Sequence, residues 1–142
     1  METIGRHLIA EFYGCPADKL DDLEHIRSSM LQAVEEIGAT LVGETFHRFA
    51  PQGVTGVVVI AESHLSIHTW PESGYVALDL YTCGGLDPRP GLESLQRALE
   101  AHNGRFQEIV RGLPRDLEPG RTIFPDDVQI LSRVVPDVNL LG

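Results

Sequence analysis

The chain has 142 residues, of which 42% are hydrophobic, so it can form one domain with a sizeable core and is too apolar for a disordered chain. Its formal net charge of −10 argues against nucleic acid as a partner, because binding phosphates requires clustered basic side chains. No apolar run approaches the roughly 20 residues that span a bilayer, and the N-terminus lacks signal-peptide features, so we expect a cytoplasmic protein without membrane contact.

The first half of the chain combines one helical pattern with several strand patterns. Residues 21–37 carry apolar side chains at helical spacing, with acidic residues at the start, and therefore predict a helix. Gly38 is a suitable C-terminal stop for that helix. The strand patterns of this half lie at 6–12, 40–49 and 56–61.

The second half repeats the same mixture. Apolar and polar residues alternate in two segments, and three leucines recur at helical spacing in a third. Beyond Leu113 the chain is rich in proline and charge, so residues 113–142 are expected to form a C-terminal tail, in which 128–135 is apolar enough to dock on the domain. The predicted elements are strands at 65–70, 75–82 and 105–111 and a helix at 92–102.

The order of these elements indicates the fold class. The pattern β-α-β-β-β-β-α-β has few obligatory crossovers between parallel strands. We therefore predict a single α+β domain of residues 1–112. It should be a two-layer sandwich, with a mainly antiparallel sheet and helices on one face.

Two kinds of prosthetic group find little support. Lys19 is the only lysine and lies in a polar stretch, whereas a pyridoxal phosphate enzyme needs a buried lysine to hold its cofactor. Cys15 and Cys83 match neither a disulfide framework nor a zinc site. On the predicted strand, His64 and His68 would be roughly 13 Å apart, too far to share one ion. We therefore expect neither pyridoxal phosphate nor a metal.

The dipeptide Glu62-Ser63 has two interpretations. Taken alone, such a serine is more often an ordinary turn residue. Its hydroxyl can also attack the Glu62 carbonyl and turn the amide into an ester, which a base eliminates to leave a pyruvoyl group at a new N-terminus. His68 is a candidate base, but it lies roughly 16 Å from Ser63 along an extended strand. A two-fold dimer would supply the histidine from the partner, so we expect a homodimer, a larger layered assembly with shared active sites.

Four segments of the chain together form a long and specific pattern. Its centre is the run from Ala61 to Glu72, AESHLSIHTWPE. The pattern resembles the prokaryotic S-adenosylmethionine decarboxylase proenzymes, over about residues 4 to 110. The segments that carry the resemblance are 5–12, 45–49, 56–72 and 79–84.

The resemblance implies roles in self-processing and catalysis. Glu62-Ser63 is similar to the self-cleavage bond, which would give fragments 1–62 and 63–142. Ser63 would become the pyruvoyl group that forms a Schiff base with the substrate. His68 would be the proton acceptor in processing, and Cys83 the proton donor in the decarboxylation. Thr55 lies where the family has a serine that assists processing, and it keeps the hydroxyl.

The resemblance also implies a substrate. Phe49, Trp70 and Glu72 are similar to substrate contacts, with a ring stacked on adenine and the carboxylate on the ribose. The implied reaction converts S-adenosylmethionine to its decarboxylated form plus carbon dioxide, for spermidine synthesis. Two alternatives stay open: the same pyruvoyl chemistry on arginine or ornithine, and a non-catalytic partner subunit.

Overall fold

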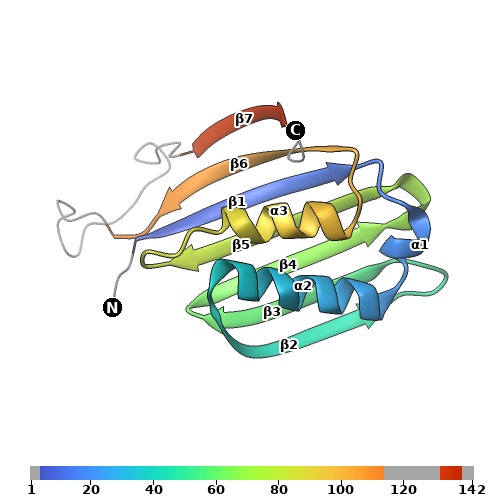
Figure 1. Ribbon diagram of the computed structural model, residues 1–142, viewed down its shortest axis with the longest axis horizontal. Coiled ribbons are helices and arrows are strands. Elements are labelled where there is room, and N and C mark those ends of the chain that lie inside the picture. Colours follow the sequence, from blue (N-terminus) through green and yellow to red (C-terminus); the bar gives the residue numbers. More distant parts are fainter. Residues whose placement is uncertain (1–3, 114–131, 139–142) are drawn as a thin grey trace, which may run out of the picture.

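Seven strands form one sheet in the computed structural model, which describes residues 4–113 and 132–138. The strand order across the sheet places segments side by side that are far apart in sequence, and all neighbouring pairs are antiparallel (Figure 1). In that order the strands are β2 (Thr40–Arg48), β3 (Val54–Ala61), β4 (Ser63–Trp70), β5 (Tyr75–Cys83), β1 (Gly5–Tyr13), β6 (Asn103–Arg111) and β7 (Ser132–Val138).

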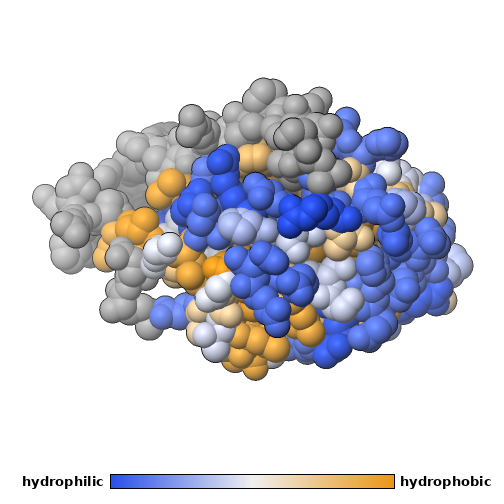
Figure 2. All heavy atoms as spheres, viewed as in Figure 1, coloured by the Kyte–Doolittle hydropathy of each residue, from blue (hydrophilic) through white to orange (hydrophobic). Residues whose placement is uncertain are grey.

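Helices cover one face of this sheet. The helices α2 (Leu23–Ile37) and α3 (Arg89–Ala98) lie next to each other on that face, and the shorter α1 (Ala17–Leu20) lies near one end (Figure 1). Hydrophilic side chains cover much of the outer surface over α3, and hydrophobic ones gather where α2 ends and β2 begins (Figure 2). The predicted α+β sandwich with helices on one face is confirmed.

The core lies between the helices and the sheet because strand residues alternate between the two faces. In β5, Val76, Leu78 and Leu80 are buried on the helix side, whereas the residues between them are only partly buried. No helix of the described residues lies on the opposite side, which we call the open face. It presents the odd-numbered residues of β1, β3 and β5 and the even-numbered residues of β4.

Helix boundaries differ from the predicted ones for local reasons. The first long helix begins at Leu23 rather than residue 21, because Asp22 is its N-cap and accepts a hydrogen bond from the His25 backbone N–H at 3.0 Å. Gly38 ends it in the left-handed region with φ 81°, as predicted. The second helix spans Arg89–Ala98 instead of 92–102. The short helix α1 was not predicted.

Part of the segment after residue 112 belongs to the sheet. The strand β7 pairs antiparallel with β6 at the sheet edge. The segment expected to dock, 128–135, overlaps this strand from Ser132 onward, while residues 128–131 lie outside the described part. Within the described residues, no helix has the length and apolar character needed to cross a bilayer.

Candidate active site

The predicted cleavage bond lies at the tip of the hairpin that joins β3 to β4. Ile60 pairs with Ser63, so only Ala61 and Glu62 form the turn. Glu62 is exposed, and Ser63 is partly buried and has a φ of 157°, an uncommon value for a residue with a side chain. The carbonyl of Glu62 and the hydroxyl of Ser63 are thus part of a tight, accessible turn.

Cys83 ends the neighbouring strand beside this tip. His64 pairs with Tyr81, so the register brings Cys83 alongside the turn residues. On the other side Cys83 pairs with Gly5, where an added Cβ would lie 2.6 Å from the Tyr81 ring and 3.4 Å from the Cys83 Sγ. Gly5 therefore leaves space for the thiol. We call Glu62, Ser63 and Cys83 the cleavage end.

The other predicted site residues surround a pocket of about 380 Å³ at the opposite end of β4. The Thr55 hydroxyl and His68 Nδ1 are 3.0 Å apart within it. Thr55 and His68 come from paired positions of β3 and β4, so the sheet register sets this contact. We call this region the pocket end; its predicted residues are Phe49, Thr55, His68, Trp70 and Glu72.

Two aromatic side chains shape the pocket end and remain accessible. Phe49 is 47% exposed and Trp70 is 42% exposed, high values for large apolar residues. The loop after Phe49 is short, since the backbone N–H of Phe49 donates to the Gly53 carbonyl at 2.8 Å. Asp21 fixes that loop by accepting from the Gly53 N–H at 2.9 Å. The nearby Glu72 is exposed in the 3-10 helix η1 (Pro71–Ser73).

The two ends cannot meet within one chain. Ser63 and His68 are the first and sixth residues of β4, and the pairing of β4 with both neighbours runs without a register shift. At the usual rise per residue, their backbones are roughly 16 Å apart. The structure therefore keeps the predicted base away from the predicted cleavage bond of its own chain.

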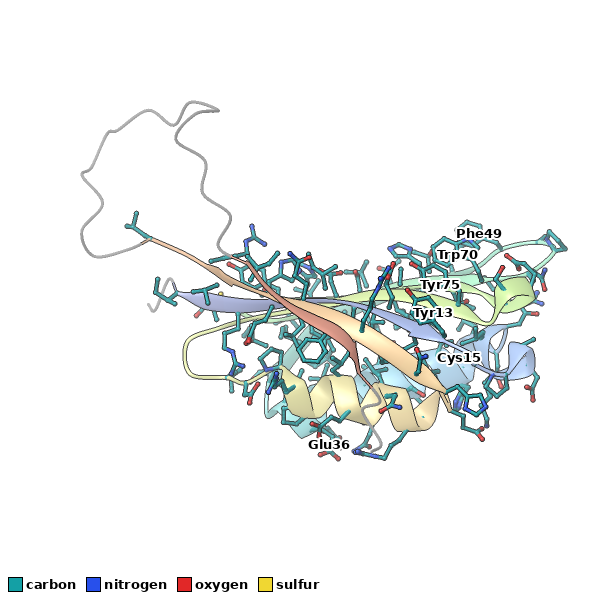
Figure 3. All side chains as sticks on the ribbon, turned by 90° about the horizontal axis from the view of Figure 1, so that it is seen from above. Tyr13, Cys15, Glu36, Phe49, Trp70 and Tyr75 are labelled. Atoms are coloured by element: carbon teal, nitrogen blue, oxygen red, sulfur yellow. The ribbon has the colours of Figure 1, made fainter. Side chains whose placement is uncertain are left out.

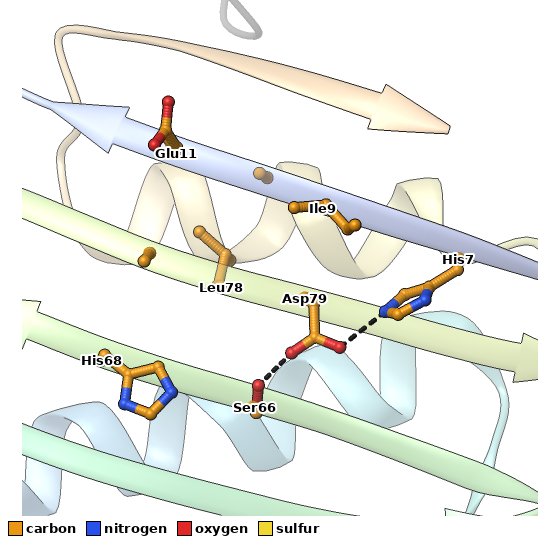
Figure 4. A pocket seen from close by; sticks show the side chains of 9 residues that line it. His7, Ile9, Glu11, Ser66, His68, Leu78 and Asp79 are labelled. Atoms are coloured by element: carbon orange, nitrogen blue, oxygen red, sulfur yellow. Dashed lines mark hydrogen bonds and ion pairs between the residues drawn. The ribbon is translucent and has the colours of Figure 1, made fainter. Parts of the chain in front are cut away.

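A polar cluster occupies the open face between the two ends. Asp79 accepts hydrogen bonds from His7 Nε2 at 2.6 Å and from the Ser66 hydroxyl (Figure 4). It also accepts one from His64 Nε2 at 2.8 Å. Burial raises the pKa of Asp79, but the hydrogen bonds from His7, Ser66 and His64 outweigh it and hold that pKa well below its usual range. Asp79 is therefore ionised and joins β1, β4 and β5.

Three side chains of the same cluster are of the types that bind metal ions. Ligand atoms of His7, His64 and Asp79 lie within 4.8 Å of one another. However, Arg111 Nη1 lies 3.1 Å from His7 Nδ1, and because a guanidinium can only donate, Nδ1 must accept and Nε2 must carry the proton. A metal on Nε2 would move that proton to face Arg111, so we assign the cluster as a hydrogen-bonded network.

Several residues of this region were not predicted to contribute. Gln52, Gly53 and Thr69 complete the pocket lining, and His7 and Asp79 build the central cluster. The detectable signal is alternation, since His7, Glu11 and Asp79 all fall on the side of β1 and β5 that lacks buried large apolar residues.

Comparisons with known proteins identify the family. The profile described as S-adenosylmethionine decarboxylase matches residues 6–112. The S-adenosylmethionine decarboxylase proenzyme of Thermotoga maritima is 53% identical over 125 residues, covering 82% of this chain and 95% of that protein. The proenzyme of Bacillus velezensis is 49% identical over 113 residues, covering 80% and 90%.

A solved structure agrees with these relatives. The crystal structure of the adenosylmethionine decarboxylase from Aquifex aeolicus superposes with a TM-score of 0.75 at 36% identity, covering 83% of this chain and 98% of that one. The profile match spans more than half of the chain, and both sequence relatives align along most of their length. The chain therefore belongs to the S-adenosylmethionine decarboxylase family.

Proposed function

We propose that this chain is a self-processing, pyruvoyl-dependent decarboxylase that acts on S-adenosylmethionine. One observation carries the proposal: complementary halves of a site lie at the two ends of β4. The cleavage end has the hydroxyl, the scissile bond and the thiol, and the pocket end has the base and a cavity lined by aromatic rings. Family membership supports the substrate and the existence of a proenzyme.

Maturation uses the residues of both ends. The Ser63 hydroxyl attacks the Glu62 carbonyl, and the amide becomes an ester. The partner's His68 removes the α-proton of residue 63, and β-elimination releases the Glu62 carboxylate. The Thr55 hydroxyl, 3.0 Å from His68 Nδ1, orients the imidazole for this step. The remaining dehydroalanine tautomerises and loses ammonia by hydrolysis, which leaves the pyruvoyl group.

The cleavage end suits a pyruvoyl group. Residue 63 begins a strand that is hydrogen-bonded on both sides, so a new N-terminus there stays fixed in place. The pyruvoyl ketone supplies the carbonyl that receives the substrate amine and the electron sink for decarboxylation. Cys83 lies beside it and returns a proton to the α-carbon, a task suited to a thiol.

The pocket end suits an adenosyl group. The exposed rings of Phe49 and Trp70 offer apolar faces for stacking on adenine. The exposed carboxylate of Glu72 is an acceptor for the ribose hydroxyls. Ornithine has no planar group to stack on these rings and arginine has only a small guanidinium, so the larger flat face of adenine fits the pocket better.

A homodimer brings the two ends together. The open face carries exposed apolar side chains, including Ile9 (43%), Val57 (39%) and Val59 (44%), which a second copy would cover. A two-fold axis between two facing sheets, directed across β4, places the cleavage end of each copy opposite the pocket end of the other. Each dimer then has two complete sites, both built from two chains.

Cleavage would not separate the fragments. Fragment 1–62 supplies β1, β2 and β3, and fragment 63–142 supplies the remaining strands. The strand β1 lies between β5 and β6, so the fragments interleave in the sheet. Both should copurify as one particle.

Intact mass and a denaturing gel of the purified protein test the proposal. The expected result is two fragments that separate only after denaturation, together with carbon dioxide release from S-adenosylmethionine. Borohydride should trap substrate on the fragment that begins at residue 63. A single full-length chain that releases no carbon dioxide from S-adenosylmethionine would overturn the proposal, and release from arginine or ornithine would redirect the substrate assignment.

A further inference from the structure

A column of aromatic side chains crosses the open face and ends at the pocket. The rings of Tyr13 and Tyr75 stack with centroids 5.8 Å apart, and Tyr75 packs on Trp70 at 5.2 Å. Trp70 in turn lies 6.4 Å from the His68 ring. Figure 3 shows Tyr13, Tyr75 and Trp70 on the side of the sheet opposite α3. We call Tyr13, Tyr75 and Trp70 the aromatic column.

Glu11 holds this column from outside the pocket. The Tyr75 hydroxyl donates to Glu11 Oε1 at 2.7 Å, and the Tyr13 hydroxyl donates to Oε2 at 2.7 Å. Arg105 Nε donates to the same Oε2 at 2.8 Å. Glu11 is not among the residues that line the pocket beside Trp70. Its carboxylate therefore holds Tyr13 and Tyr75 at their hydroxyl ends, while the Tyr75 ring packs on Trp70 of the pocket lining.

We call Glu11 and the three side chains that donate to it, Tyr13, Tyr75 and Arg105, the clamp. Glu11 and Tyr75 keep their protonation states near neutral pH. Hydrogen bonds from Tyr13, Tyr75 and Arg105 lower the pKa of Glu11 to about 2. Burial and the hydrogen bond to Glu11 raise the pKa of Tyr75 to about 12. The carboxylate thus remains an acceptor and the phenol a donor.

We propose that Glu11 is a positioning residue for substrate binding, which acts by locking Tyr75 and through it the orientation of Trp70 in the pocket wall. The inference rests on the proposed function for its kinetic consequence, and its structural part stands without it. Trp70 is 42% exposed, so a large part of the indole has no packing partner among the described residues. The Tyr75 ring packs on the indole and restrains it. Without the hydrogen bond to Glu11, Tyr75 could move and Trp70 could change rotamer. Ordering Trp70 again on binding would then lower the affinity for a ligand that stacks on it.

Trp70 is the only tryptophan of the chain, so its fluorescence reports directly on the wall. In Glu11→Gln a single amide oxygen replaces the two carboxylate oxygens that accept from Tyr75, Tyr13 and Arg105, and the NH2 group faces the donors that this oxygen does not reach, which loosens the hold on both rings. We expect Trp70 to become more accessible to acrylamide, the KM for S-adenosylmethionine to rise about tenfold and kcat to stay unchanged, since the loss is one of ground-state order. Glu44→Gln is the matched control, because it removes a carboxylate paired with Arg27 and should leave both readouts unchanged.

Tyr75→Phe provides a second route if Glu11→Gln folds poorly. It keeps the ring and removes only the hydroxyl that Glu11 holds, so it should reproduce the change in quenching and KM to a smaller extent. Unchanged quenching and unchanged KM in a folded Glu11→Gln protein would overturn the inference. If the wild type neither cleaves itself nor releases carbon dioxide, the proposed function fails, and the quenching comparison alone still decides whether Glu11 locks Trp70.

Discussion

The two ends of β4 differ in how they are built. The cleavage end is a hairpin tip, where Glu62 and Ser63 are neighbours in sequence and the proposed reacting group is the backbone itself. The pocket end gathers side chains from β3, β4 and the segments around them, and its backbone contributes only support. The proposed self-cleavage therefore depends on one accessible backbone bond, whereas the proposed substrate binding depends on how side chains from several segments are arranged.

The experiment with the largest expected effect inactivates the cleavage end in one chain and the pocket end in another. It tests whether the two ends act together across two chains. Ser63→Ala should abolish cleavage and activity, and His68→Ala should abolish cleavage. When the two variants are unfolded together and refolded at equal amounts, about a quarter of all chains should cleave, because half of random dimers are mixed and each has one intact site. A gel that resolves the cleaved fragments measures this fraction.

Each variant refolded alone is the control for that mixture and should show no cleavage. No cleavage in the mixture, with mixed dimers demonstrated by mass spectrometry, would mean that each chain serves its own bond. In that case the two ends would have to approach within one chain, against the extended geometry of β4.

Cys83 separates processing from catalysis at the cleavage end. Cys83→Ser should leave the chain cleaved but lower kcat by about 10² to 10⁴, the usual contribution of a positioned acid. Cys15→Ala is the matched control, since burial raises the pKa of that thiol to about 11 and it lies outside both ends. Fragment analysis and carbon dioxide release measure the two effects, and a Cys83→Ser chain that fails to cleave would contradict this division.

The stacking surface of the pocket end should affect binding more than chemistry. Phe49→Leu keeps an apolar side chain but removes the ring, and since stacking on a base is worth about 1–3 kcal/mol, KM should rise about tenfold or more. Cleavage should proceed normally. Val42→Ala is a control, because Val42 is 65% exposed and does not line the pocket. An unchanged KM would remove Phe49 from the substrate contacts.

The smallest effect concerns the cluster between the two ends. Because the folded-state pKa of Asp79 lies below its unfolded value of about 3.9, its charge stabilises the fold at neutral pH, and this contribution is lost as pH falls below about 4. Asp79→Asn should cost about 1–3 kcal/mol at pH 7, since its amide N–H groups face histidine donors. The difference from wild type should shrink toward pH 3, as followed by thermal unfolding.

Asp87→Asn serves as the control for that experiment. Asp87 forms an exposed ion pair with Arg6, so its loss should change stability by less than about 1 kcal/mol. A difference between wild type and Asp79→Asn that stays constant from pH 7 to pH 3 would show that the ionised carboxylate of Asp79 does not stabilise the fold.

Much of the fold could be predicted because the patterns are local. Val76, Leu78 and Leu80 alternate with polar residues and mark β5 and its buried face. The separation of Ser63 from His68 also follows from strand geometry alone. The ends of the helices are predicted less accurately. The sequence pattern places Asp22 inside the first long helix, whereas its side chain caps that helix, which begins at Leu23.

The central cluster and the clamp could not be predicted, because they depend on which strands become neighbours. His7 and Asp79 are 72 positions apart and meet only because β1 lies beside β5. Glu11 reaches Tyr75 across the same pair of strands. The alternation of polar and apolar residues assigns such a residue to one face of the sheet. Its partners depend on the order of the strands in the sheet, which the alternation does not reveal.

The position of β1 has a consequence for the lifetime of the mature protein. In the precursor, unfolding and refolding are events of one chain. If the bond after Glu62 is cut as proposed, the sheet will consist of two separate polypeptides, with β1 of one fragment held between strands of the other. Refolding then requires an encounter between them, so its rate depends on concentration, and at high dilution a single unfolding event is irreversible.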